Sequence, residues 1–124
     1  MEQFSRTISL VGQSAFDRVH QARVAVFGVG GVGGYVCEAL VRSGIAEIDL
    51  FDRDDVSISN LNRQIIALHS TIGQDKVDAM AARLKDINPD VRVNCRKMFY
   101  LPTNADEVDL SVYDLSLIHI SEPT

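Results

Sequence analysis

Residues 23–34 read RVAVFGVGGVGG, and this stretch decides the fold. Its first part, Arg23–Phe27, is a short apolar run rich in β-branched residues, which is typical of a strand buried on both faces of a parallel sheet. The glycines follow at once. Apolar residues in 32–42 then recur at offsets of four, seven and eight, which predicts a helix with one face on the sheet. The segment therefore predicts a strand, a tight glycine turn and a helix in direct succession.

The same alternation continues along the chain. Glu47–Asp52 is a second apolar strand, and from Lys76 on, apolar residues at offsets of three, four, seven and ten predict a second covering helix that Asn88-Pro89 ends. Val91–Cys95 alternates in and out as a third strand. The fold class is therefore α/β, a Rossmann-like doubly wound parallel sheet with three clear strands.

The two ends of the chain carry weaker patterns. Residues 4–22 are expected to form an amphipathic segment, with Phe16 and Val19 on one helical face after the apolar residues Ile8, Leu10 and Val11. Residues 103–113 are acidic and turn-like, with room for one helical turn capped by Thr103 or Asn104.

Composition limits the chain to one ordinary globular domain. The 124 residues are 46% hydrophobic and 23% charged, and the net charge of -5 comes without blocks of like charge, which by itself argues against a nucleic-acid-binding surface. The start of the chain has no signal-like pattern and no window approaches a membrane span, so a cytoplasmic location and no membrane partner are expected. Cys37 and Cys95 are expected to be buried free thiols.

The glycines between residues 28 and 34 suit phosphate binding. Glycine permits the tight turn, lets backbone N–H groups approach a phosphate and lets helix and strand pack closely, while the helix N-terminus supplies partial positive charge. Asp52, at the end of the second strand, is expected to accept hydrogen bonds from ribose hydroxyls. These features do not distinguish NAD, FAD and ATP, so a NAD-binding oxidoreductase or a cofactor-binding module stays open.

A polar stretch after Asp52 separates these alternatives. Residues 52–64 read DRDDVSISNLNRQ and residues 73–76 read GQDK, in place of an immediate second helix. An adenylating enzyme must hold a triphosphate, neutralise the charge that develops as pyrophosphate leaves and chelate a divalent metal, which calls for arginine, lysine, asparagine and aspartate together. A solvated loop with no such role is the plain alternative.

The motifs GVGGVGG, LFDRDDVSISNLNRQ and GQDKV, in this order, resemble the superfamily of ubiquitin-activating enzymes and the bacterial enzymes that adenylate sulfur-carrier proteins. The chain is most similar to the tRNA threonylcarbamoyladenosine dehydratases, and this resemblance covers residues 1–114. The segments that carry it are MEQFSRT, NRQIIALHSTIG and FYLPTNADEVDLSVYD. The resemblance implies an ATP-binding adenylation domain in which Asp52 holds the ribose, Asp54 lies on the metal side or behind the ligands, and the residues that line the phosphates or act in catalysis are Gly28, Gly30, Gly31, Gly33, Asn60, Arg63 and Lys76.

The resemblance also implies a reaction and its partners. In the dehydratase branch, ATP with Mg²⁺ activates the carboxylate of the threonine side arm of a modified tRNA adenosine, and the adenylate then closes a ring with net loss of water. In the carrier branch the activated group is the C-terminus of a sulfur-transfer partner protein. A homodimer is expected from the family, and Arg6 matches an arginine that reaches the partner's ATP site in carrier relatives.

The last ten residues, LSLIHISEPT at 115–124, depart from the family and resemble a translated sequencing adapter. The family continues into a fourth strand that ends in a magnesium-binding aspartate, and Ser121 stands at that place. Because a neutral hydroxyl is a poor ligand for Mg²⁺, we assign no metal ligands and expect ATP binding with little turnover. The apolar residues of 115–120 could still fill the place of the fourth strand.

Overall fold

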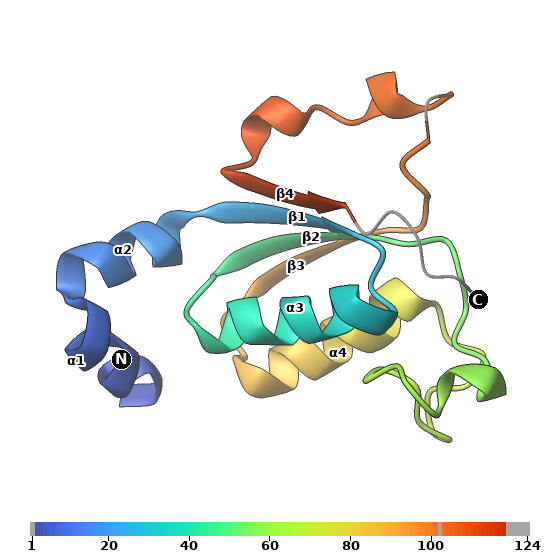
Figure 1. Cartoon of the computed structure of the whole chain (residues 1–124), viewed down its shortest axis with the longest axis horizontal. Helices are drawn as coiled ribbons and strands as arrows, with labels where there is room; N and C mark the ends of the chain where they lie inside the picture. Colours follow the sequence, from blue (N-terminus) through green and yellow to red (C-terminus); the bar gives the residue numbers. More distant parts are fainter. Residues whose placement is uncertain (1, 102, 119–124) are drawn as a thin grey trace.

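The computed structural model describes residues 2–101 and 103–118, and its centre is a parallel four-stranded sheet (Figure 1). The strands lie in the order β3-β2-β1-β4. This order matches one half of the Rossmann arrangement and confirms the predicted fold class. The bounds of the strands are β1 Arg23–Phe27, β2 Glu47–Phe51, β3 Arg92–Arg96 and β4 Leu115–Ile118.

The fourth strand comes from the segment 115–124 that was expected to depart from the family. Leu115 pairs with Val24 and Leu117 with Val26 in a parallel register along β1. Apolar character is sufficient here because a strand beside β1 needs only backbone pairing and one apolar side to pack. Ser121, the predicted replacement for the metal-binding aspartate, lies outside the described residues.

Two helices cover one face of the sheet, α3 (Gly31–Arg42) and α4 (Lys76–Ile87), as Figure 1 shows. Both helices were predicted, and α4 buries the expected residues Val77, Met80 and Leu84. The expected buried side of α3 is wrong: Val32 and Ala39 are exposed, and Gly33, Gly34, Cys37 and Val41 face the sheet instead, because the glycines allow the helix to approach the strand closely. Alternate residues of β1 and β2 point to the two helices because side chains alternate along a strand. The largest buried cluster includes Val24, Val26, Cys37, Val41, Ile48, Leu50, Met80 and Leu84.

The opposite face is covered by residues 98–101 and 103–114, which lie between the edge strand β3 and β4 on the far side of β1 (Figure 1). It contains two short 3-10 helices, η3 (Ala105–Glu107) and η4 (Leu110–Val112). The core here is small: Phe27 and Phe51 stack at 4.4 Å and Val108 packs on them. The chain changes direction between β1 and β4, and the carboxyl ends of the strands at such a point form the usual ligand crevice of open α/β sheets.

The N-terminal helices differ from the prediction. After η1 (Glu2–Phe4), helices α1 (Ser5–Val11) and α2 (Gln13–Gln21) lead into the amino end of β1. Val19 is exposed and Leu10 is 86% exposed, so the expected continuous apolar face is wrong. Phe4 and Phe16 are buried instead, because their rings pack on each other and the Phe16 ring occupies the space above the turn after α3.

The two cysteines differ. Cys37 is buried in α3, and this burial raises the pKa of its thiol to about 12. Cys95 is exposed, so its predicted burial is wrong; β3 is an edge strand, and the Cys95 thiol donates a hydrogen bond to the carbonyl of Val77 at 3.4 Å. Among the described residues, no helix is long and apolar enough to cross a membrane.

Candidate functional site

The glycine loop joins β1 to α3, and two of its glycines are required by geometry. Gly28 has φ +93°, a region that favours glycine, and its N–H donates to the carbonyl of Phe51 at 2.7 Å. A Cβ on Gly33 would lie 1.8 Å from the carbonyl oxygen of Gly28, so any side chain there would collide with the backbone. The loop is therefore shaped by close contact between helix and strand, as predicted.

The amino end of α3 has no side-chain cap. Gly30 is the N-cap of this twelve-residue helix and supplies no side chain to cap it. The first N–H groups of an α-helix have no partner within the helix, and with the helix dipole they favour phosphate or carboxylate. A negatively charged group of phosphate size fits this end chemically.

Asp52, the residue expected to hold the ribose, joins the glycine loop to the exit of β2. The residue is 4% exposed, and its carboxylate accepts the Val29 N–H at 3.0 Å and the Asp54 N–H at 2.9 Å. A carboxylate has about four acceptor positions, so two remain for ribose hydroxyls. The sequence predicted the ribose role of Asp52 but missed its bond to Val29, which no spacing pattern indicates.

The polar stretch after β2 is folded onto the glycine loop and is no solvated loop. Gln64 is 4% exposed, and a Cβ on Gly30 would lie 2.7 Å from its Oε1 atom. Ile65 lies similarly close to Gly34. Gln64 was missed as a site residue, although its place next to Arg63 in the quoted stretch was the available signal. The contact brings residues 58–66 to the amino end of α3.

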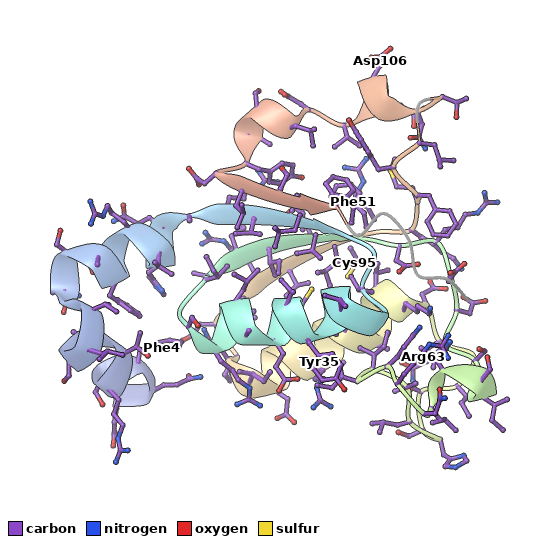
Figure 2. All side chains as sticks on the ribbon, viewed as in Figure 1. Phe4, Tyr35, Phe51, Arg63, Cys95 and Asp106 are labelled. Carbon is purple, nitrogen blue, oxygen red and sulfur yellow. The ribbon has the colours of Figure 1, made fainter. Side chains whose placement is uncertain are left out.

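Asn60 and Arg63 lie on this polar stretch in different settings. Asn60 ends the 3-10 helix η2 (Ile58–Asn60), is 7% exposed, and accepts the N–H of Ser57 at 2.9 Å and its hydroxyl at 3.0 Å. Its Oδ1 therefore shapes the loop. Arg63 is exposed and donates to the Ser59 carbonyl at 3.0 Å; Figure 2 labels it on the loop near α3. Arg63 directly precedes Gln64 in the chain, so this loop carries a positive charge one residue before the side chain that contacts the glycine loop.

Lys76 is the first residue of α4 and is nearly buried. It is 6% exposed, its Nζ lies 4.0 Å from Oδ2 of Asp54, and its backbone N–H donates to the Asp54 carbonyl at 2.9 Å. Asp54 itself is exposed, with 58% of its side chain accessible. Asp54 follows Asp52 by two residues, so these contacts fix Lys76 beside the segment that leaves β2.

The predicted site residues come together in two linked groups. Asp52 joins the glycine loop to the exit of β2, and Asp54 joins that exit to α4. Gln64 connects the loop that carries Asn60 and Arg63 to the glycine loop. Across residues 2–101 and 103–118, no three His, Cys, Asp or Glu side chains gather so as to hold a metal ion. The arrangement suits a polyanion with a ribose, held by N–H groups and cations.

The strand order and the glycine turn define the class of protein: a Rossmann-like α/β domain whose glycine turn leads directly into α3. The model of the ThiF family matches residues 4–115, and the chain belongs to this family.

Its relatives include the tRNA threonylcarbamoyladenosine dehydratase of Bacillus subtilis, 52% identical over 100 residues, which are 81% of this chain and 39% of that protein. The ubiquitin-like modifier-activating enzyme 5 of Bombyx mori is 46% identical over 79 residues, 64% of this chain and 20% of that one. The crystal structure of the E. coli dehydratase in complex with ATP superposes with a TM-score of 0.92 at 39% identity, over 98% of this chain and 50% of that chain. The chain thus spans about two fifths of the length of the B. subtilis relative.

Proposed function

We propose that this chain binds ATP at the carboxyl edge of β1 and β2, as the nucleotide-binding part of an adenylating enzyme. The observation that carries the proposal is the packing of Gln64 against Gly30, because it folds the polar stretch onto the phosphate loop. A NAD-binding oxidoreductase has little need for the cations Arg63 and Lys76 beside the ribose. The E. coli relative whose structure was solved with ATP supports the choice of nucleotide.

Each residue of the site receives a role. The backbone of Gly28, Gly30, Gly31 and Gly33 lines the phosphates and adenosine, and Asp52 accepts the ribose hydroxyls. Asn60, Arg63 and Lys76 contact the triphosphate and stabilise the charge that develops as pyrophosphate leaves, so they are the catalytic residues we propose. Asp54 would lie on the metal side of the site or behind the ligands of a bound Mg²⁺, which would offset the negative charge of the triphosphate.

The reaction we propose is activation of a carboxylate. A carboxylate oxygen attacks the α-phosphorus of ATP, the bond to the β-phosphate oxygen breaks, and pyrophosphate leaves. In a tRNA threonylcarbamoyladenosine, attack on the resulting acyl adenylate from within the same side arm closes a ring and releases AMP, with net loss of water from the substrate. The B. subtilis relative carries the name of this activity, which supports tRNA as substrate. We propose a cytoplasmic location for this chain.

A second candidate is activation of a carrier protein, which the similarity to the ubiquitin-like modifier-activating enzyme of Bombyx mori favours. The activation step is the same, and only the carboxylate differs. For either substrate we propose a homodimer. In the carrier-activating case Arg6, which is exposed on α1, reaches the partner's site, whereas the dehydratase case does not need this residue.

We further propose that residues 1–114 form the adenylation domain and that 115–124 are foreign to it. The family match, which covers residues 4–115, supports this division. Ser121 then stands in place of the metal-binding aspartate, so ATP binds but turns over slowly. Sequencing the gene beyond Tyr113 tests the division, and ATP–pyrophosphate exchange by the chain alone tests the second statement; rapid exchange would contradict it.

Thermal unfolding with ATP and Mg²⁺ or with NADH tests the class of ligand. A ligand that binds only the folded state raises the midpoint in proportion to the logarithm of its concentration over Kd. We expect ATP to raise the midpoint and NADH to leave it unchanged. Lys76→Met should weaken ATP binding about tenfold, the effect of one charged hydrogen bond. Greater protection by NADH would refute the proposal.

A further inference from the structure

A short two-stranded ribbon holds Lys76 beside the exit of β2. Val56 donates to the Gln74 carbonyl at 2.8 Å, Gly73 donates to the Val56 carbonyl at 2.8 Å, and Asp55 and Asp75 form an antiparallel bridge. The Lys76 N–H to Asp54 bond continues the ribbon into α4. The place of Lys76 relative to Asp52 therefore depends on how firmly the ribbon stays closed.

Two negatively charged residues face each other in the ribbon. Asp55 and Asp75 stand opposite each other across the bridge, and like charges directly opposite destabilise a strand pair. Asp75 is also the N-cap of α4, yet its side chain makes no capping hydrogen bond to the helix. Its carboxylate is engaged elsewhere.

Lys97 resolves this repulsion. Its Nζ donates to Oδ1 of Asp75 at 2.5 Å and to Oδ1 of Asp55 at 3.2 Å. Because these two hydrogen bonds favour its charged form, the pKa of Lys97 is raised, and the bond from Lys97 also lowers the pKa of Asp75. Lys97 follows directly after β3, so one ammonium group ties the third strand to both sides of the ribbon. Its charge is committed to two carboxylates and is not free for a phosphate.

We propose that Lys97 is a positioning residue for the triphosphate: it keeps the ribbon closed, and thereby holds the Lys76 ammonium at the nucleotide. Without Lys97, the two carboxylates repel each other across the bridge, and the ribbon that leads into the Lys76 N–H to Asp54 bond opens. This inference rests on the proposed ATP site. Its effect falls on the β- and γ-phosphates, because Lys76 contacts the triphosphate and the glycine loop is held independently by Asp52.

Calorimetric titration of the whole chain with ATP and with AMP, both with Mg²⁺, tests the role of Lys97. We expect Lys97→Met to raise the Kd for ATP about fivefold, the upper end for an exposed ion pair, and to leave the Kd for AMP unchanged. Lys97→Arg, which keeps the charge, should restore ATP binding. The matched control is Lys85→Met; Lys85 lies on α4 and donates to the Val91 carbonyl at 2.9 Å, so its loss should change neither Kd.

The outcomes separate the two proposals. Equal weakening of ATP and AMP by Lys97→Met would mark Lys97 as merely structural and overturn the inference, and so would unchanged ATP binding. Failure of Lys97→Arg to restore binding would also overturn it. If the unsubstituted chain binds neither ATP nor AMP, the proposed function itself fails.

Discussion

The face of the sheet under α3 and α4 carries a cluster of sixteen buried apolar residues, whereas the cluster on the opposite face holds four among the described residues. The first face is closed by two regular helices, α3 and α4. The second is closed by an irregular segment, and a buried carboxylate, Asp49, lies on it at 3% exposure. Asp49 accepts bonds from the Tyr113 hydroxyl at 2.5 Å, Arg23 at 2.8 Å and Asn94 at 2.7 Å.

The candidate site lies on the face of the sheet with the larger buried apolar cluster. The glycine loop, the polar stretch and Lys76 all belong to elements that pack on the helical face. The second face is held by polar and aromatic contacts between residues far apart in the chain, such as Tyr113 with Asp49 and Phe27 with Phe51. We infer that nucleotide binding depends on the first face, whereas the second face contributes only to stability.

The largest effect should come from the junction of helix and strand on the first face. Gly33→Val places a side chain where a Cβ is already 1.8 Å from the Gly28 carbonyl oxygen, so the helix must move off the strand. We expect a loss of more than about 3 kcal/mol of unfolding free energy, beyond ordinary overpacking. Urea unfolding measures it. Val32→Ala, at a neighbouring residue that is 61% exposed, is the control and should change stability by less than about 0.5 kcal/mol.

A pair of leucine truncations compares the faces directly. Leu84, fully buried under the sheet on α4, should cost about 3 kcal/mol when changed to alanine, because a cavity remains. Leu110, partly buried on η4, should cost about 1 kcal/mol by the same change, since less apolar area is lost. The midpoints of urea unfolding measure both. Equal costs would contradict the contrast between the two faces.

These two faces also differ in how well sequence predicts them. The periodic apolar residues of 76–87 predict both α4 and its buried side, because a helix that covers a sheet needs one apolar stripe. Those of 32–42 predict the helix α3 but not its buried side, because Gly33 and Gly34 face the sheet. The covering segment 98–114 has no such period, and its anchor joins Tyr113 to Asp49, 64 residues apart. The position of a tyrosine hydroxyl in space cannot be obtained from spacing along the chain.

The site was predictable to a similar extent. Gly28, Gly33 and Asp52 follow from the strand–turn–helix order and lie where expected. Gln64 against Gly30 and the Lys97 bridge were missed, because both depend on how the irregular stretch 52–76 folds back. Local sequence rules carry no information on that return path.

A smaller effect should follow from removing one hydrogen bond on the second face. Tyr113→Phe deletes the hydroxyl that donates to Asp49 and keeps the ring, so about 1 kcal/mol should be lost. Chemical unfolding near neutral pH measures the loss. Tyr35→Phe is a matched control, since Tyr35 is 54% exposed on α3, and its stability should stay unchanged. A loss as large as that of Leu84→Ala would mean that the second face is as important as the first.

The smallest effect concerns alkaline pH. Burial and the bond to Asp49 raise the pKa of Tyr113 to about 12, from a value near 10.0 in the unfolded chain. The folded state therefore holds this proton more tightly, and its stabilising contribution is complete below pH 10 and is lost as pH rises toward 12. The native chain should lose its stability advantage over Tyr113→Phe across this interval in urea unfolding. A constant difference between the two chains would contradict the assignment.

Hydrogen–deuterium exchange with and without ATP and Mg²⁺ tests most directly that the nucleotide binds on the helical face. We predict slower exchange in residues 28–34 and 58–66, where Gly30 and Gln64 meet, and unchanged exchange in 98–114 on the second face. Protection of 98–114 alone, or of neither region at saturating ATP, would contradict the account.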